Sequence, residues 1–215
     1  MDPAEKVRLP PDEAALLVRL RAGDRDAFTA LVRHHGGAML RLARSLARGA
    51  GAAEEVVQDA WVGALDGLER FEGRASLRTW LLGIVANKAR TRAARDGRSV
   101  PFSALFEQDP DAPAVDPASF LPDGHWRDGP RHWAEADPER LALGAETRAA
   151  IETAIAGLPE GQRAVITLRD VEGLEAAEAC NVLGITETNQ RVLLHRARAR
   201  VRAALGPYLG GARAC

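Results

Sequence analysis

The alternation of apolar and polar residues predicts four helices within residues 12–98. Apolar positions recur there at spacings of three and four, which is the period of a helix with one buried face. They gather in groups at 15–20, 28–32 and 39–46, and the breaks fall at Gly23-Asp24 and around Gly49–Gly51. Helices joined by such short connections favour a compact bundle.

Helix starts can be placed within this segment. Asp24 is a good cap for the second helix and Ser76 for the fourth, which we expect to run to about Asp96. The third helix is expected to begin near Ala53, with acidic residues in its first turn. Its predicted packing stripe is Val56, Val57, Ala60, Trp61, Ala64 and Leu65, and its predicted outward residues are Glu55, Gln58, Asp59 and Val62.

Residues 99–138 differ from the segments on either side. They hold seven of the 12 prolines and show no sustained periodicity, so we expect an extended linker. Trp126 and Trp133 stand out in it. Local packing against a domain is the favoured interpretation of the two, and an anchor that docks on a partner is the alternative.

A second helical domain is predicted at 139–209, with helices near 141–156, 160–171, 174–183 and 186–205. Glycines and a proline mark the joints between them. The last two helices are separated by Leu183-Gly184-Ile185-Thr186, the short glycine-containing turn of a helix-turn-helix. Residues 1–11 and 210–215 remain as tails.

Composition agrees with an all-α protein of two small domains. Only 5% of residues are aromatic, and runs of β-branched residues are nearly absent. No apolar stretch reaches the roughly 20 residues of a membrane span, so we expect no membrane insertion and a cytoplasmic location. Cys180 and Cys215 form no metal-type pair; we expect Cys180 to be a small buried residue and Cys215 a tail thiol.

The net charge of -1 hides an uneven distribution. Residues 52–69 carry five acids and no base, residues 70–98 carry eight bases, and at 99–145 acids outnumber bases nine to three. After Thr186 there are six arginines and one glutamate. Two basic segments separated by acidic ones predict two nucleic-acid contacts in a protein that does not bind DNA indiscriminately.

Two sets of motifs resemble the extracytoplasmic-function sigma factors of bacterial RNA polymerase. Residues 53–61 (AEEVVQDAW), 71–81 (FEGRASLRTWL) and 84–87 (IVAN) are similar to their second conserved region. Residues 157–159 (GLP), 183–185 (LGI) and 194–198 (LHRAR) are similar to their fourth. The resemblance implies a sigma factor that binds core polymerase, promoter DNA and an anti-sigma factor.

The resemblance assigns a partner to each surface. The outward residues of the acidic helix, Glu55, Gln58, Asp59 and Val62, would dock on the coiled coil of the clamp in the polymerase largest subunit. The loop at 72–76 and the helix after it would open and hold the minus-ten element, through a polar pocket for an unstacked base and arginines for phosphates. Those residues are Glu72, Gly73, Arg74, Ser76, Arg78, Trp80, Asn87, Lys88, Arg90 and Arg92. Trp80, at helical spacing from Ile84, is more often a core residue.

The second helix of the helix-turn-helix would read the minus-thirty-five element in the major groove. The candidate contacts are Thr188, Asn189, Gln190, Arg191, His195 and Arg198. A more limited interpretation is that Gln190 covers the core and only Arg191, His195 and Arg198 reach DNA. Val192 and Leu193 replace a small polar residue and a base that are common in the family, so the contacted sequence does not follow from the resemblance.

Enzymatic functions find little support. The histidines lack an acid and a third ligand at metal spacing, and there is no phosphate-binding glycine loop or nucleophile elbow, so we expect no catalytic residue, metal or cofactor. Two other classes stay open. A stand-alone helix-turn-helix regulator leaves the acidic helix unexplained, and a protein-interaction adaptor leaves both arginine-rich helices unexplained.

Overall fold

The computed structural model describes residues 11–47, 49–96 and 138–210. The first part contains α1 (Pro11–Arg21), α2 (Arg25–Leu46), α3 (Ala50–Gly67), a short 3-10 turn (Leu68–Arg70) and α4 (Leu77–Arg95). The second contains α5 (Pro138–Ala156), α6 (Glu160–Ile166), a π-helical turn (Thr167–Val171), α7 (Ala176–Leu183) and α8 (Glu187–Gly210). Every regular element in these ranges is helical, as the sequence predicts.

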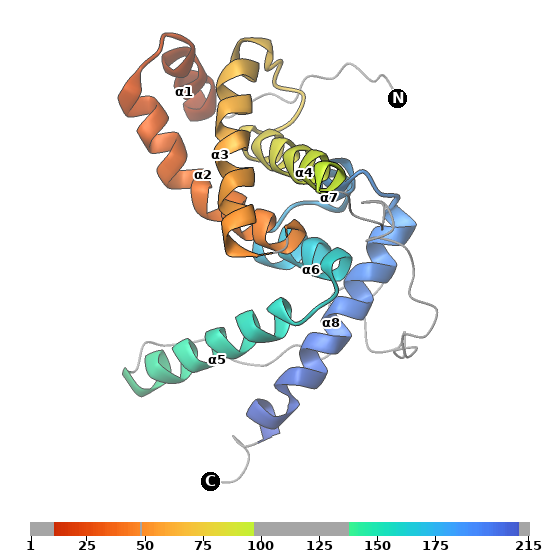
Figure 1. The fold of residues 1–215 in the computed structure, drawn as a ribbon. Helices are drawn as coiled ribbons and strands as arrows, with labels where there is room; N and C mark the ends of the chain where they lie inside the picture. Colours follow the sequence, from red (N-terminus) through yellow and green to blue (C-terminus); the bar gives the residue numbers. More distant parts are fainter. Residues whose placement is uncertain (1–10, 48, 97–137, 211–215) are drawn as a thin grey trace.

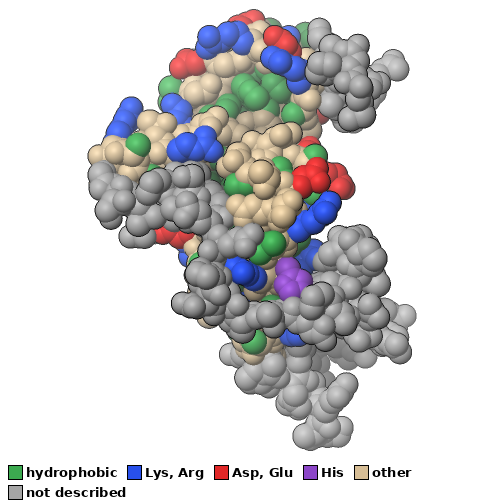
Figure 2. Space-filling model, turned by 90° about the vertical axis from the view of Figure 1, so that its right-hand side faces the viewer, with side chains coloured by type: hydrophobic (Ala, Val, Ile, Leu, Met, Phe, Trp, Pro, Cys, Tyr) green, Lys and Arg blue, Asp and Glu red, His purple; other side chains and the backbone are tan. Residues whose placement is uncertain are grey.

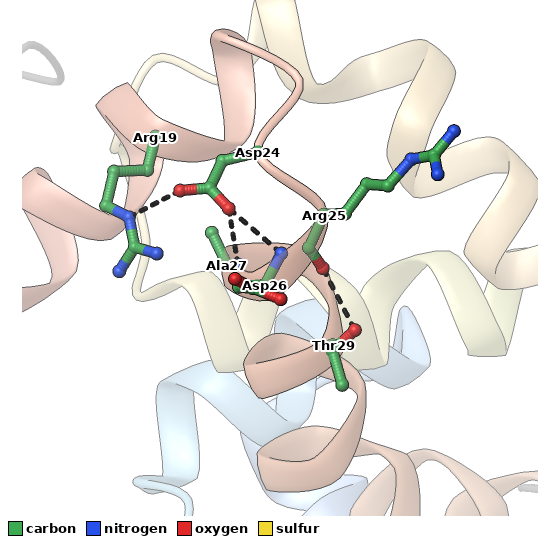
Figure 3. Close-up of polar contacts among 6 residues, drawn as sticks. All are labelled: Arg19, Asp24, Arg25, Asp26, Ala27 and Thr29. Atoms are coloured by element: carbon green, nitrogen blue, oxygen red, sulfur yellow. Dashed lines mark hydrogen bonds and ion pairs between the residues drawn. The ribbon is translucent and has the colours of Figure 1, made fainter.

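The starts of α2 and α4 confirm both predicted caps. Asp24 Oδ1 accepts hydrogen bonds from the backbone N–H groups of Asp26 (2.9 Å) and Ala27 (3.1 Å), as Figure 3 shows. Arg19 binds the other carboxylate oxygen at 2.8 Å and, as the largest cause, lowers the pKa of Asp24. Ser76 Oγ accepts from Thr79 N at 3.1 Å in the same way. These bonds satisfy N–H groups that have no partner within the helix.

The third helix begins earlier than its acidic residues indicate. It starts at Ala50 after Gly49, whose φ is 92°, so Glu54 and Glu55 lie beyond its first turn and the helix-dipole argument does not apply to them. Its predicted stripe packs inward except at Leu65, which is 52% exposed. The buried part of the stripe therefore ends before Leu65, although the helical period alone places Leu65 on the same face.

A single cluster of buried apolar side chains runs through both parts of the chain. In the first part its largest fully buried members include Met39, Leu42 and Leu81, and in the second Leu168 and Leu183. Figure 1 shows why the cluster is continuous: α6 lies against the end of α2, and α7 lies beside α4. The helices α5 and α8 pack on each other and extend away from the bundle.

The predicted linker at 99–138, with Trp126 and Trp133, lies outside the described residues apart from Pro138, which begins α5. Cys215 also lies outside them, whereas Cys180 is buried, as predicted. Burial is the main cause that raises the pKa of the Cys180 thiol. Within the described ranges, no helix is both long and apolar enough to cross a membrane.

Candidate nucleic-acid interface

One hollow among the described residues lies where α4 begins. It has a volume of about 330 Å³ and brings together four predicted site residues: Glu72, Arg74, Trp80 and Asn87. The structure adds lining residues that were not among the individual candidates, namely Arg70, Phe71, Ala75, Thr79, Gly83 and Ile84 from the same half, and Asn181 and Val182 from α7. The pocket thus combines aromatic rings, amides and arginines.

An aromatic pair forms one wall of this pocket. The ring centroids of Phe71 and Trp80 lie 4.8 Å apart with a tilt of 46°. Trp80 is only partly buried, so it is both a packing residue and a lining residue. Gly67 allows this placement, since a Cβ there would lie 3.1 Å from the indole ring. Gly73 turns the following loop with a φ of 70°, which favours glycine.

Helix α1 holds the loop that forms the pocket. Arg21 donates hydrogen bonds to the backbone carbonyls of Phe71 (2.7 Å) and Leu68 (3.3 Å). Glu13 accepts a hydrogen bond from the backbone N–H of Leu77 at 2.5 Å, at the first residue of α4. Sequence reasoning missed both residues. No local signal connects them to partners that lie 47 to 64 positions away, because their role arises only when α1 packs beside that loop.

The predicted phosphate contacts lie along α4 and its loop, and most already have partners. Arg74 is exposed and pairs with Glu72 at 3.1 Å. Arg78 forms an ion pair with Glu172, which belongs to the second half of the chain. Arg90 donates to the side-chain oxygen of Asn87 at 2.8 Å.

Lys88 and Arg92 line a second hollow, of about 190 Å³, between α3 and α4. There Arg92 forms an ion pair with Glu55, and that contact is the main cause of the raised pKa of Arg92. Arg92, which the sequence predicts to contact DNA, therefore pairs with Glu55, which it predicts to contact polymerase. The two predicted surfaces adjoin at this edge.

The outward face of α3 carries acidic and apolar side chains together. Glu55, Gln58 and Asp59 are exposed, as the stripe predicts, and Val62 is 58% exposed. Leu65 extends the apolar part by one helical turn. An exposed apolar centre with a charged rim is typical of protein–protein interfaces.

The helix-turn-helix has the predicted geometry. Gly184, with a φ of 68°, ends α7 and donates its N–H to the carbonyl of Cys180 at 2.8 Å. The turn Gly184–Thr186 leads directly into α8. Thr186 Oγ1 accepts from Asn189 N at 3.3 Å, which fixes the first turn of the recognition helix.

The candidate reading residues of α8 fall into two groups. Thr188 and Arg191 are exposed, and Asn189 and His195 are partly buried. Gln190 is only 2% exposed and Arg198 only 6%. Arg198 donates to both carboxylate oxygens of Asp170, at 2.9 and 2.8 Å. In this conformation Gln190 and Arg198 face the domain interior, which the more limited interpretation expected for Gln190 but not for Arg198.

On the face drawn in Figure 2, the described basic side chains do not form one continuous patch. Figure 2 shows them at several separate places on its face, with acidic groups beside some of them. Burial, followed by the nearby Arg196 and Arg198, lowers the pKa of His195, which favours the neutral imidazole. Among the described residues, no group of three His, Cys, Asp or Glu side chains is placed to hold a metal ion.

The geometry defines a class of two-part helical proteins in which a helix-turn-helix is joined to a bundle with a polar and aromatic pocket. Residues 31–99 match the family model for sigma-70 region 2, and residues 148–201 match the model for sigma-70 region 4. The chain is 31% identical to the RNA polymerase sigma-H factor of Pseudomonas aeruginosa, with 90% of this chain and 94% of that one covered. It is 28% identical to the ECF RNA polymerase sigma-E factor of Escherichia coli, over 92% and 96%.

Two solved structures share the fold. CnrH in complex with the cytosolic domain of CnrY has a TM-score of 0.52 and 25% identity, covering 91% of this chain and 97% of that one. The sigma factor RpoE of Bartonella quintana in complex with the anti-sigma factor NepR has a TM-score of 0.53 and 22% identity, over 83% and 96%. The protein belongs to the extracytoplasmic-function group of the sigma-70 family.

Proposed function

We propose that this sigma factor directs core RNA polymerase to promoters through three surfaces of its own chain. The outward face of α3 docks on the polymerase clamp, the pocket at the start of α4 holds the opened minus-ten strand, and α8 reads the minus-thirty-five element. Polymerase supplies the chemistry, and this chain contributes binding groups and no catalytic residue. Its place of action is the cytoplasm, where polymerase and chromosome meet.

The pocket at the start of α4 is the observation that carries this proposal. An unstacked base is held by aromatic surfaces and by hydrogen bonds to its edge. Phe71 and Trp80 supply the rings, and Asn87 offers amide N–H donors, while its side-chain oxygen also accepts from Arg90. Arg74, at the rim, supplies a guanidinium for the neighbouring phosphates. A repressor that binds only paired DNA has no use for such a pocket.

The face of α3 supports a docking role for this helix. Val62 and Leu65 give it an apolar centre, and Glu55, Gln58 and Asp59 give it an acidic and polar rim. A basic coiled coil with apolar positions complements such a surface, and the clamp coiled coil of polymerase is the partner that we assign. Charge complementarity would direct the approach, and the apolar centre would supply most of the binding energy.

The DNA-reading role of α8 is restricted to the residues that its packing leaves accessible. Thr188, Asn189 and Arg191 lie in the first turns of α8, the part that a helix-turn-helix presents to base edges. His195 follows one turn later and is suited to a neutral hydrogen bond. We leave Gln190 and Arg198 out of the proposed contact set because both are buried.

An anti-sigma factor is the regulator that we propose. The two solved structures described above are complexes, one with the cytosolic domain of CnrY and one with the anti-sigma factor NepR. The exposed apolar residues of α3 and the pocket of α4 offer an inhibitor two surfaces that transcription also needs. An inhibitor that covers either surface would block polymerase or promoter DNA by direct competition.

Run-off transcription tests the docking surface. Purified core polymerase is supplied with a library of promoter fragments and with the wild-type chain, Val62→Asp or the control Val18→Asp. Both valines are exposed, on α3 and α1 respectively. We expect protein-dependent transcripts with the wild type and the control, and a loss of at least tenfold with V62D, because a carboxylate replaces the apolar centre. Equal transcription by all three refutes the assignment of α3.

The pocket is tested on the promoter recovered from that library. Asn87→Ala removes the amide from the pocket, and Thr91→Ala is the control one turn further along α4, outside the pocket at the start of that helix. We expect N87A to reduce permanganate reactivity of the opened minus-ten strand while it leaves binding to core unchanged. Tight binding of duplex DNA without polymerase, and no transcript with it, would instead support a stand-alone regulator.

A further inference from the structure

The recognition helix α8 begins with an exposed ion pair. Glu187 is the first residue of α8, and Arg191 follows one helical turn later, with its Nη2 donating to Glu187 Oε2 at 3.4 Å. The acid lies N-terminal to the base at a spacing of four residues, which is the more favourable order on a helix. The Glu187 side chain is 62% exposed and the Arg191 side chain 77% exposed, so both groups face solvent in the free protein.

The fold of the domain does not require this pair. An ion pair in contact with water contributes little to stability, because solvent screens the attraction. The first turn of α8 already has a cap, since Thr186 Oγ1 accepts from Asn189 N at 3.3 Å and the Thr186 carbonyl accepts from Gln190 N at 2.9 Å. A role for Glu187 is therefore to be sought in what α8 binds.

The next two residues of α8 offer nothing polar to a base. Leu193 is only 2% exposed and Val192 is half-buried, at two positions where a small polar residue and a base are common in the family. Neither side chain can form a hydrogen bond. Reading of bases therefore depends more strongly on the residues that precede Val192, and the charged residues among these are Glu187 and Arg191.

A carboxylate at the start of a recognition helix discriminates among the groups that DNA presents. This part of the helix points at base edges in the major groove. The phosphates beside the groove repel a carboxylate, and so do the O6 and N7 acceptors of guanine and the O4 acceptor of thymine. Because an ionised carboxylate only accepts hydrogen bonds, it can bind only the amino groups of cytosine and adenine. Glu187 therefore disfavours two of the four bases.

Cytosine suits a carboxylate better than adenine does. The N4 amino group is the hydrogen-bonding group that cytosine shows in the major groove, whereas the N6 amino group of adenine lies beside the N7 acceptor. That acceptor repels the second oxygen of a carboxylate. The side-chain amides of Asn and Gln avoid this repulsion, since they donate to N7 and accept from N6. The acid at Glu187 therefore favours cytosine.

Arg191 supplies the complementary chemistry for guanine. A guanidinium forks to O6 and N7, and Nη2 keeps one hydrogen for this fork when Glu187 accepts the other. One helical turn advances by about 5.4 Å, which exceeds the ~3.4 Å between base pairs, so the two side chains suit neighbouring base pairs. The ion pair also limits the directions in which the flexible guanidinium points, and this reduces the entropy lost on binding.

We propose that Glu187 determines part of the promoter specificity of this sigma factor. Its carboxylate accepts a hydrogen bond from the N4 amino group of a cytosine in the minus-thirty-five element, and it holds Arg191 toward a guanine in the neighbouring base pair. This inference rests on the assignment of α8 to that element under the proposed function. Glu187 acts as much by repulsion as by attraction, because every other base presents an acceptor to it.

The test selects DNA with holoenzyme assembled from core polymerase and the full chain. Its substrate is a pool of duplex promoters with a fixed minus-ten element and a randomised minus-thirty-five element, and the bound DNA is sequenced. Glu187→Gln removes the charge and keeps the size, and the control Glu152→Gln makes the same change at an exposed acid of α5. We expect the wild type and E152Q to select a cytosine beside a guanine. We expect E187Q to lose at least about fivefold of the cytosine preference at that base pair alone, with adenine enriched there.

A second variant separates the two contacts of the pair. Arg191→Met should lose the guanine preference and keep the cytosine preference, since the carboxylate remains. In E187Q the guanine preference should weaken without disappearing, because Arg191 is present but no longer held. Circular dichroism should show the same helical content in all four chains, because both side chains of the pair are exposed.

The selection distinguishes failure of this inference from failure of the proposed function. If the wild type selects a minus-thirty-five sequence and E187Q selects the same one, only the role of Glu187 is refuted. An equal change in the affinity of E187Q for every sequence also overturns it, since such a change carries no specificity. If the wild type shows no base preference in the randomised element, the assignment of α8 fails, and the inference fails with it.

Discussion

The ion pair between Asp170 and Arg198 allows a test of whether Arg198, which the sequence assigns to DNA, is a DNA contact or a structural residue. The side chain of Arg198 is 7% exposed, that of Asp170 is 31% exposed, and two hydrogen bonds join them. Loss of one partner from a fully buried pair costs about 3–5 kcal/mol. Because Asp170 keeps part of its surface in water, we expect Asp170→Asn to lower the free energy of unfolding by about 2–3 kcal/mol.

Replacement of the arginine is expected to cost less than replacement of the aspartate. In Arg198→Met an apolar chain of similar length fills the space, and the partly exposed Asp170 returns to water, so we expect a loss of about 1 kcal/mol. In the double variant, Asp170→Asn with Arg198→Met, the loss in free energy of unfolding should be about 1–2 kcal/mol smaller than the sum of the two single losses.

Urea unfolding followed by circular dichroism measures these differences. With a slope of about 2 kcal/mol per molar, D170N should shift the midpoint down by about 1 M. The salt dependence of holoenzyme binding to promoter DNA is the second measurement, and loss of a phosphate contact reduces that slope by about 1. A D170N loss below about 0.5 kcal/mol, together with a reduced salt slope in R198M, would show that Arg198 contacts DNA and that the structural reasoning is wrong.

Three further predictions concern other residues. Arg21→Met removes the hydrogen bonds of this side chain to the carbonyls of Leu68 and Phe71, so we expect weaker strand opening in permanganate footprinting with unchanged binding to core; equal footprints would rule out a positioning role. Burial, then His34 and Arg78, lowers the pKa of His35 from 6.5 to about 4, so the unfolded chain binds more protons between those values. Stability should fall as the pH drops through that window and fall less in His35→Gln, and equal urea midpoints of the two chains across the window would contradict this. Buried Cys180, whose thiol pKa is raised, should react slowly with iodoacetamide at neutral pH in a C215S chain and rapidly after unfolding; equal rates would contradict its burial.

The parts of the fold that follow from neighbouring residues could be predicted from the sequence. Asp24 and Ser76 cap their helices because a short polar side chain reaches the free N–H groups of its own first turn. The turn at Gly184 is likewise local, since glycine adopts a positive φ at little cost. The outward face of α3 also follows from periodicity, with the exception of Leu65.

The site could be predicted only in part. The motifs of the α4 region placed Trp80, Asn87 and Arg74 around one pocket, because these residues lie on one loop and the helix that follows it. The same reasoning gave Arg198 to DNA and left Gln190 open between a DNA contact and a place over the core. Helical spacing shows which residues share a face of α8 but not how wide a strip of that face the domain covers, and the covered strip includes both.

The all-helical class, the positions of most helices, the family and the chemistry available on α3, α4 and α8 follow from the sequence alone. Which of those groups are accessible, and which are already paired, became clear only from the packing of the helices. Glu172 illustrates this: its ion pairs with Arg41 and Arg78 join residues that are 131 and 94 positions apart in the sequence. Local propensity acts within a turn or two of helix, whereas burial and charge pairing depend on which surfaces meet.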